Sequence, residues 1–121
     1  MKYLSSPYSS PDARMMEERF RQACRCAAHF MRAGITVLSP IAASHPLVLH
    51  GNLPQTDQRF WASHNEEWLM HCNALWVLML PGWRESIGIR REMEHAESLG
   101  LPIKYVTWEG YNLLDTPPED D

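Results

Sequence analysis

The sequence predicts a single α/β domain in which a mainly parallel sheet lies between two layers of helices. Strand-like and helix-like segments alternate along the 121 residues, as is typical of parallel strands joined by helical crossovers. The strongest strand signal is the run ALWVLML at residues 74–80, which is apolar throughout, as expected for a strand buried on both faces. The chain is long enough to bury a real core, and no repeat or linker divides it.

The first part of the chain predicts a strand, a helix and a second strand. Residues 2–4 form a short strand, which the serine-rich loop SSPYSS follows. A helix is predicted to open at Pro11 with Ser10 as its cap, because apolar residues then recur at helical spacing. Gly34 ends this helix, and residues 35–38 form the second strand.

The middle of the chain predicts a long loop and then a helix. Residues 39–55 contain three prolines and show no period, so we expect a loop that acts as a lid over the strand ends. Thr56 or Asp57 is predicted to cap the next helix, which runs to about Cys72 and leads into the strand at 74–80.

The last part of the chain predicts a strand–helix–strand unit. A short loop at residues 81–85 precedes a helix that Ser86 caps and Gly100 ends. Residues 103–106 form a fourth strand. Residues 107–121 are expected to be a C-terminal segment with an acidic, frayed end.

This order of elements predicts a flavodoxin-like or Rossmann-like sheet with strand order 2-1-3-4, in a domain at residues 1–106. Ligands of such sheets bind beyond the carboxyl ends of the strands, where the winding direction reverses. That point lies between the first and third strands, where the loops at residues 5–10 and 81–88 meet. Each loop leads into a helix N-terminus, which favours an anion.

Composition excludes several classes of partner. The formal net charge of −4 argues against a nucleic-acid polymer, and no run of about 18 apolar residues predicts a membrane span. The N-terminal residues have no apolar signal core. Cys24, Cys26 and Cys72 have neither the spacing of a disulfide framework nor that of a zinc site. We therefore expect a cytoplasmic protein with reduced thiols and no metal.

Glu92 is the candidate catalytic residue. A carboxylate near a helix start, partly covered by the lid, would suit attack on an anomeric carbon or activation of water; a solvent-exposed glutamate paired with arginine fits the same spacing. The serines of the first loop fit either phosphate and sugar binding or ordinary turn and cap roles. His45 is the histidine expected to contact a ligand, and Trp83 is the tryptophan placed in the site loop.

Three sequence motifs resemble the nucleoside 2-deoxyribosyltransferase superfamily. They are YLSSPY at residues 3–8, PGW at residues 81–83, and SxGxxxExxxA at residues 86–96. The resemblance extends to about Val106 and is strongest to a small uncharacterised bacterial and phage branch, related to deoxynucleoside 5′-monophosphate N-glycosidases. It implies a Rossmann-like fold and cleavage of the N-glycosidic bond of a nucleoside or nucleotide, without a cofactor.

The resemblance also implies roles for single residues. Glu92 matches the nucleophile that forms a glycosyl-enzyme, and Tyr3 matches the tyrosine that orients it. Ser86 stands where the transferases have aspartate and the related hydrolases have serine. The substrate-binding residues expected from the loops and the resemblance are Ser5, Ser6, Pro7, Tyr8, Ser9, His45, Asn65, Gly82, Trp83, Ser86 and Gly88.

Two departures from the family pattern leave an alternative open. Asn65 stands where the family usually has an aspartate that assists the sugar or the base, and Ser9 stands where the hydrolases have an arginine. The alternative is a nucleotide-binding sensor that has kept the pocket and lost the chemistry. The chain also resembles nucleotide phosphoribohydrolases, but more weakly, because its loop lacks the glycine pair of their motif.

The resemblance also implies assembly, because members of the nucleoside 2-deoxyribosyltransferase superfamily form dimers or larger oligomers in which a neighbour's C-terminal segment often completes the site. Trp108, Tyr111 and Asn112 are the residues of this chain that would take that part. We therefore expect a homo-oligomer.

Overall fold

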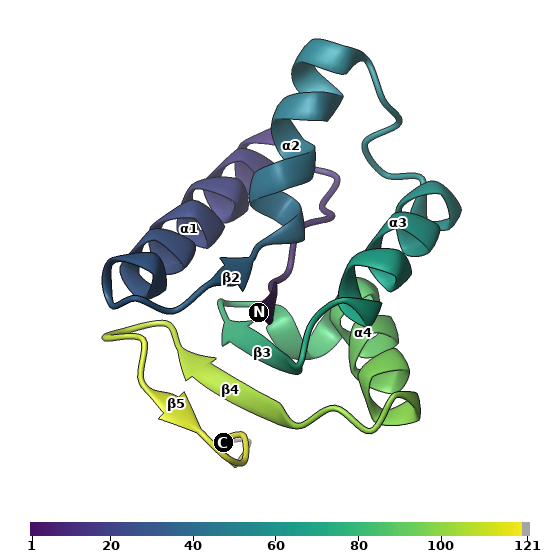
Figure 1. Ribbon diagram of the computed structural model, residues 1–121. Coiled ribbons are helices and arrows are strands. Elements are labelled where there is room, and N and C mark those ends of the chain that lie inside the picture. Colours follow the sequence, from purple (N-terminus) through teal and green to yellow (C-terminus); the bar gives the residue numbers. More distant parts are fainter. Residues whose placement is uncertain (120–121) are drawn as a thin grey trace.

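A computed structural model of the chain describes residues 1–119 and has a five-stranded sheet with four α-helices (Figure 1). The elements in chain order are β1 (Lys2–Ser5), α1 (Ala13–Arg32), β2 (Val37–Leu38), α2 (Pro40–Gly51), α3 (Gln58–Met70), β3 (Ala74–Met79), the 3₁₀ turn η1 (Trp83–Glu85), α4 (Ile87–Ser98), β4 (Ile103–Thr107) and β5 (Leu113–Leu114).

The sheet has the order β2-β1-β3-β4-β5, and its first four strands are parallel. The predicted order 2-1-3-4 is confirmed. β5 is an addition at the edge that pairs antiparallel with β4. It was missed because a strand of two residues carries too little sequence to show a period.

The core lies on both faces of the sheet, because successive side chains of each strand point to opposite faces. Leu4, Trp76 and Leu78 belong to the cluster that packs against α1. The cluster on the other face, against α3 and α4, includes Tyr3 and Leu75. The expected three-layer α/β architecture is therefore present.

The predicted lid loop at residues 39–55 is wrong, because most of it forms α2. Ser39 caps this helix by accepting a hydrogen bond from the Ala42 amide at 3.2 Å, and Pro40 occupies its first turn, where proline is favoured. Pro46 lies inside the helix, where its missing N–H usually disrupts helices. The helix rises away from the sheet beside α1 (Figure 1), so its sequence shows little amphipathic period.

The other helix starts agree with the sequence to within two residues. Asp57 caps α3 and Ser86 caps α4, as predicted. α1 is capped by Asp12, whose carboxylate accepts from the Arg14 amide at 2.9 Å, while Ser10 accepts from the Asp12 amide instead.

The C-terminal segment packs against its own chain. Tyr111 lies 5.0 Å from His29 between ring centroids, whereas Trp108 is 44% exposed. The Pro118 carbonyl accepts a hydrogen bond from Arg84. The acidic end that was expected to be frayed includes residues 120–121, which lie outside the described residues. The homo-oligomer stays a prediction.

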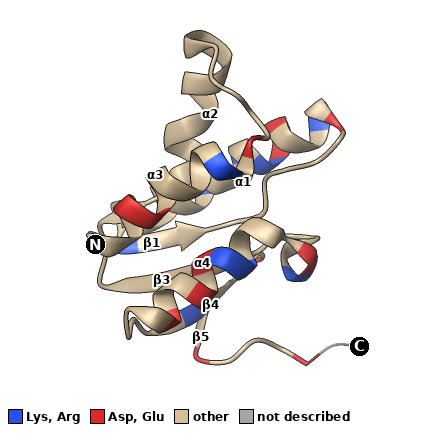
Figure 2. Ribbon diagram, turned by 90° about the vertical axis from the view of Figure 1, so that its right-hand side faces the viewer, with Lys and Arg blue, Asp and Glu red and all other residues tan. Residues whose placement is uncertain are grey.

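Acidic and basic residues are interspersed on α4 in the view of Figure 2. Such mixing fits the net charge of −4 better than it fits a continuous basic surface for a nucleic-acid backbone. Exclusion of a nucleic-acid polymer stays a prediction.

Candidate functional site

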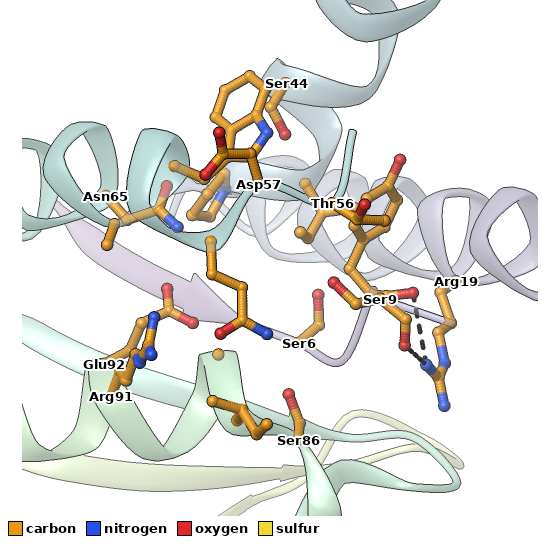
Figure 3. A pocket seen from close by; sticks show the side chains of 18 of the residues that line it. Ser6, Ser9, Arg19, Ser44, Thr56, Asp57, Asn65, Ser86, Arg91 and Glu92 are labelled. Carbon is orange, nitrogen blue, oxygen red and sulfur yellow. Dashed lines mark hydrogen bonds between the residues drawn. The ribbon is translucent and has the colours of Figure 1, made fainter. Parts of the chain in front are cut away.

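A cavity of about 530 Å³ opens at the carboxyl ends of β1 and β3. Its walls come from the loop after β1, from α2 and α3, and from the first half of α4 (Figure 3). This is the position that the topology predicts for a ligand. The sequence-predicted site residues that line it are Ser6, Tyr8, Ser9, Asn65, Gly82, Ser86, Gly88 and Glu92.

Five predicted residues lie outside the cavity lining, namely Tyr3, Ser5, Pro7, His45 and Trp83. Trp83 was expected to bind the substrate, but it packs against Tyr105 at 5.9 Å between ring centroids. The 3₁₀ turn directs it toward the cluster behind the loop, where it borders a separate shallow hollow. Pro7 and Ser5 are buried behind the cavity wall.

Glu92 is the half-buried carboxylate of the cavity. It lies on α4, and the Ser5 hydroxyl at the end of β1 donates to its Oε1 at 3.0 Å. Burial raises the pKa of Glu92 from 4.5 to about 7, while the hydroxyls of Tyr3 and Ser5 favour the carboxylate and lower it. The position holds a carboxyl that exchanges its proton near neutral pH.

Tyr3 lies beneath Glu92 and is fully buried. Burial first, and then the charge of Glu92, raises the pKa of the Tyr3 hydroxyl. Its oxygen is near Glu92 but has no partner in hydrogen-bond geometry among residues 1–119. Tyr3 can therefore complete a hydrogen bond to Glu92 after a small movement, which fits the orienting role that the resemblance implies.

The start of α4 offers free hydrogen-bond donors to the cavity. Ser86 accepts from the Ile89 amide at 3.2 Å, which leaves the amides of Ile87 and Gly88 without an intrahelical partner, as in every first helical turn. Ser6 stands between Glu92 and Ser9 in Figure 3. It is 5% exposed, and its buried hydroxyl has no partner among the described residues. Such a group is suited to a ligand hydroxyl or phosphate oxygen.

Arg19 is a cavity residue that the sequence analysis missed. From α1 it donates to the Ser9 carbonyl at 2.9 Å (Figure 3) and to the Pro81 carbonyl at 3.4 Å, so it joins the two site loops. A Cβ at Gly82 would lie 2.7 Å from its Nη2, and the φ of +89° there also favours glycine. A signal existed: Arg19 follows the buried Met16 by three residues, on the inward face of α1.

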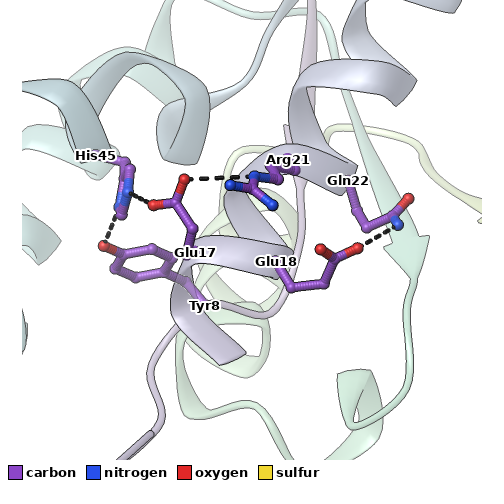
Figure 4. A network of polar contacts seen from close by, with 6 residues as sticks. All are labelled: Tyr8, Glu17, Glu18, Arg21, Gln22 and His45. Carbon is purple, nitrogen blue, oxygen red and sulfur yellow. Dashed lines mark hydrogen bonds and ion pairs between the residues drawn. The ribbon is translucent and has the colours of Figure 1, made fainter. Parts of the chain in front are cut away.

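His45 lies behind Tyr8 and is 2% exposed. Its Nδ1 is 2.6 Å from the Tyr8 hydroxyl and its Nε2 is 2.7 Å from Oε2 of Glu17, as Figure 4 shows. Gln55, which lines the cavity, donates to the same Tyr8 oxygen at 2.9 Å. Glu17 and Gln55 were missed because neither belongs to a local motif.

A protein-family model described as a domain of unknown function, DUF1937, matches residues 1–108. The chain belongs to this family. No curated protein matches it. The matched range of this DUF1937 domain runs from β1 through β4 and therefore contains the whole cavity lining.

Three further observations describe this DUF1937 domain within residues 1–119. No group of three or more metal-ligating side chains gathers there. None of its helices combines the length and the hydrophobicity that crossing a bilayer requires. Its three cysteines are free thiols.

Proposed function

We propose that this domain cleaves the N-glycosidic bond of a nucleoside or nucleotide, or transfers its deoxyribosyl group, through Glu92 as nucleophile. The observation that carries this proposal is the half-buried Glu92 carboxyl at the cavity wall, held by Ser5 at 3.0 Å. A structural glutamate on a helix surface would instead be solvated or ion-paired. A desolvated carboxyl in a cavity is typical of a group that reacts.

In the proposed reaction, the oxygen of Glu92 that does not bind Ser5 attacks C1′ of the sugar. The bond from C1′ to the base breaks, and its electron pair moves to the base nitrogen, which must take up a proton. Water or a second base then attacks C1′ and releases Glu92. Hydrolase and transferase differ only in this acceptor.

The cavity has the size and the polar groups for such a substrate. Its volume of about 530 Å³ lies within the range of small-molecule sites. The Ser6 hydroxyl and the first amides of α4 would bind sugar or phosphate oxygens, and Arg19 supplies a positive charge at the opposite side. A cytoplasmic location, where nucleotides occur and thiols stay reduced, fits this function.

Asn65 favours a second candidate, a nucleotide-binding sensor with reduced chemistry. Asn65 lines the cavity where the resembled family has aspartate, and an amide cannot exchange a proton as a carboxyl does. This candidate predicts a thermal shift with a nucleotide and no base release on long incubation. Asn65→Asp is then the variant expected to restore turnover.

The deciding experiment incubates the protein with 2′-deoxynucleosides and their 5′-monophosphates, with and without an acceptor base. Chromatography measures released or exchanged base. Glu92→Ala is compared with Glu94→Ala, which removes an exposed carboxylate of the same helix. Turnover that only Glu92→Ala abolishes supports the proposal. Full turnover in Glu92→Ala contradicts it, and binding without any turnover favours the sensor.

A further inference from the structure

The polar network behind the cavity is centred on the buried His45 and joins three separate parts of the chain. Glu17 comes from α1, His45 from α2 and Tyr8 from the loop after β1 (Figure 4). Both ring nitrogens of His45 are engaged, at 2.6 Å and 2.7 Å, and Phe20 stacks on the ring at 4.3 Å between centroids. The imidazole is therefore fixed in one orientation with Tyr8 at its cavity end.

The chemistry of these partners restricts where the protons lie. The Glu17 carboxylate only accepts, so Nε2 of His45 donates to it. When Nδ1 also carries a proton, it donates to the Tyr8 oxygen, which Gln55 already supplies with a second hydrogen bond at 2.9 Å. The hydroxyl proton of Tyr8 then has no acceptor in this network and is free for a group in the cavity, whereas with a neutral imidazole the same hydroxyl donates to Nδ1.

We propose that Tyr8 is the catalytic acid that protonates the leaving base, and that His45 and Glu17 are positioning residues that hold Tyr8 and return its proton. This role rests on the proposed function, because the reaction there requires a proton on the base. Asn65, at the position where the resembled superfamily has aspartate, cannot supply one. Burial raises the pKa of the Tyr8 hydroxyl, which keeps it protonated at neutral pH.

The proton and electron balance of the step is complete. A Glu92 oxygen forms a bond to C1′ while the bond from C1′ to the base nitrogen breaks, and the electron pair stays on the base. In the form of His45 with protons on both nitrogens, the base nitrogen takes the hydroxyl proton of Tyr8, and the Tyr8 oxygen takes the proton of His45 Nδ1. His45 becomes neutral and still donates to Glu17 through Nε2. Attack by water or by a second base reverses these proton transfers.

The test compares leaving groups that differ in their need for a proton. The protein is assayed with natural 2′-deoxynucleosides and with p-nitrophenyl 2-deoxyriboside, each with and without a 5′-phosphate. p-Nitrophenolate leaves without protonation. Tyr8→Phe is expected to lower kcat on the natural substrates about 100-fold or more, within the usual range for acid catalysis, and to change kcat on p-nitrophenyl substrates less than about threefold.

A second variant keeps the test valid if Tyr8→Phe fails to fold. Glu17→Gln retains a hydrogen-bond acceptor for His45 but removes the charge, at a side chain that is 39% exposed. We expect about a tenfold loss on natural substrates only. Tyr105→Phe, a tyrosine outside the cavity, is the matched control and should change neither rate. Thermal unfolding checks that each variant is folded.

The outcomes separate the acid role from the proposed function. Loss confined to natural substrates supports Tyr8 as the acid. If turnover depends on Glu92 but Tyr8→Phe slows both substrate types alike, or neither, the acid role is wrong and the proposed function stands. Absence of any turnover that depends on Glu92 overturns the proposed function, and the acid role with it.

Discussion

The two walls of the cavity are built in different ways. The α4 wall takes its chemistry from one short stretch, in which Ser86 caps the helix and Glu92 follows six residues later. The other wall, formed by α1, α2 and the loop after β1, takes its chemistry from residues far apart in sequence, with Tyr8 and His45 separated by 37 positions. The sequence analysis named residues on both walls, but it did not predict the contacts that packing forms between Tyr8, His45 and Glu17.

The walls also differ in how well their polar groups are satisfied. On the α1–α2 side, both nitrogens of His45 have partners within 2.7 Å. On the α4 side, burial of Glu92 raises its pKa to about 7, and Nε2 of the cavity residue His95 has no hydrogen-bond partner among residues 1–119. Unsatisfied groups are typical of a surface that a ligand completes, and satisfied ones of a surface that supports it.

The largest effect is expected at the α4 wall. Glu92→Gln keeps the side-chain shape but removes the nucleophile, so kcat/KM should fall by about 10³-fold or more. In the wild type, kcat/KM should rise about tenfold per pH unit as the pH approaches 7 from below, because only ionised Glu92, with its pKa near 7, attacks. A rate that is flat between pH 5 and 8 contradicts Glu92 as the nucleophile.

A substitution at His45, in the wall that contains α2, should affect mainly the stability of the protein. His45→Ala removes a buried ring stacked on Phe20 and leaves the Tyr8 hydroxyl with one hydrogen bond fewer. The free energy of unfolding should fall by about 2–4 kcal/mol, measured by urea denaturation. His50→Ala, at an exposed position of the same helix, is the control. Equal small losses in both variants would show that the network does not stabilise α2.

The same contrast explains how much of the fold the sequence predicted. Four strands and their order followed from alternating elements, because the crossover rules leave few arrangements once the apolar run at residues 74–80 is central. α2 was missed because a proline such as Pro46 usually marks the end of a helix and because α2 presents no regular apolar stripe to the core. Its burial of His45 against Glu17 is a tertiary contact, which no local pattern encodes.

The residues of the candidate site also fall into those that a local sequence signal placed at the cavity and those that only tertiary packing brings there. Glu92, Ser86 and the first loop were placed at the cavity because each follows a strand end or begins a helix. Arg19 and Gln55 reach it through packing alone. Trp83 was assigned to the site from its place in the loop, but the 3₁₀ turn directs its ring the other way.

Because the Glu92 carboxyl is desolvated, the free energy of unfolding should depend on pH. The folded protein binds its proton more tightly than the unfolded chain, with a pKa of about 7 against 4.5. The stabilisation of the folded state that comes from this tighter proton binding is fully present below pH 4.5 and is lost as the pH rises through 7. At pH 8, Glu92→Gln should therefore be more stable than the wild type by about 1–3 kcal/mol, and at pH 4 the difference should vanish. Thermal unfolding at both pH values tests this.

Arg19 should set the preference for a phosphorylated ligand. Arg19→Met keeps the length of the side chain and removes the guanidinium, so the affinity for a deoxynucleoside monophosphate should fall about tenfold. The affinity for the free deoxynucleoside should change less than about threefold. Isothermal titration with both ligands measures the difference. Equal losses would show that Arg19 only ties the Ser9 and Pro81 loops together.

The smallest effect is expected at the start of α2. Ser39→Ala removes the acceptor for the Ala42 amide and should lower the free energy of unfolding by about 1 kcal/mol. Because α2 carries His45, which fixes Tyr8, the loss should also raise hydrogen exchange within residues 40–51. If the cap acts only locally, exchange at α4 stays unchanged, and the two walls of the cavity are energetically independent. Faster exchange in both helices would instead show that α2 and α4 open as one unit.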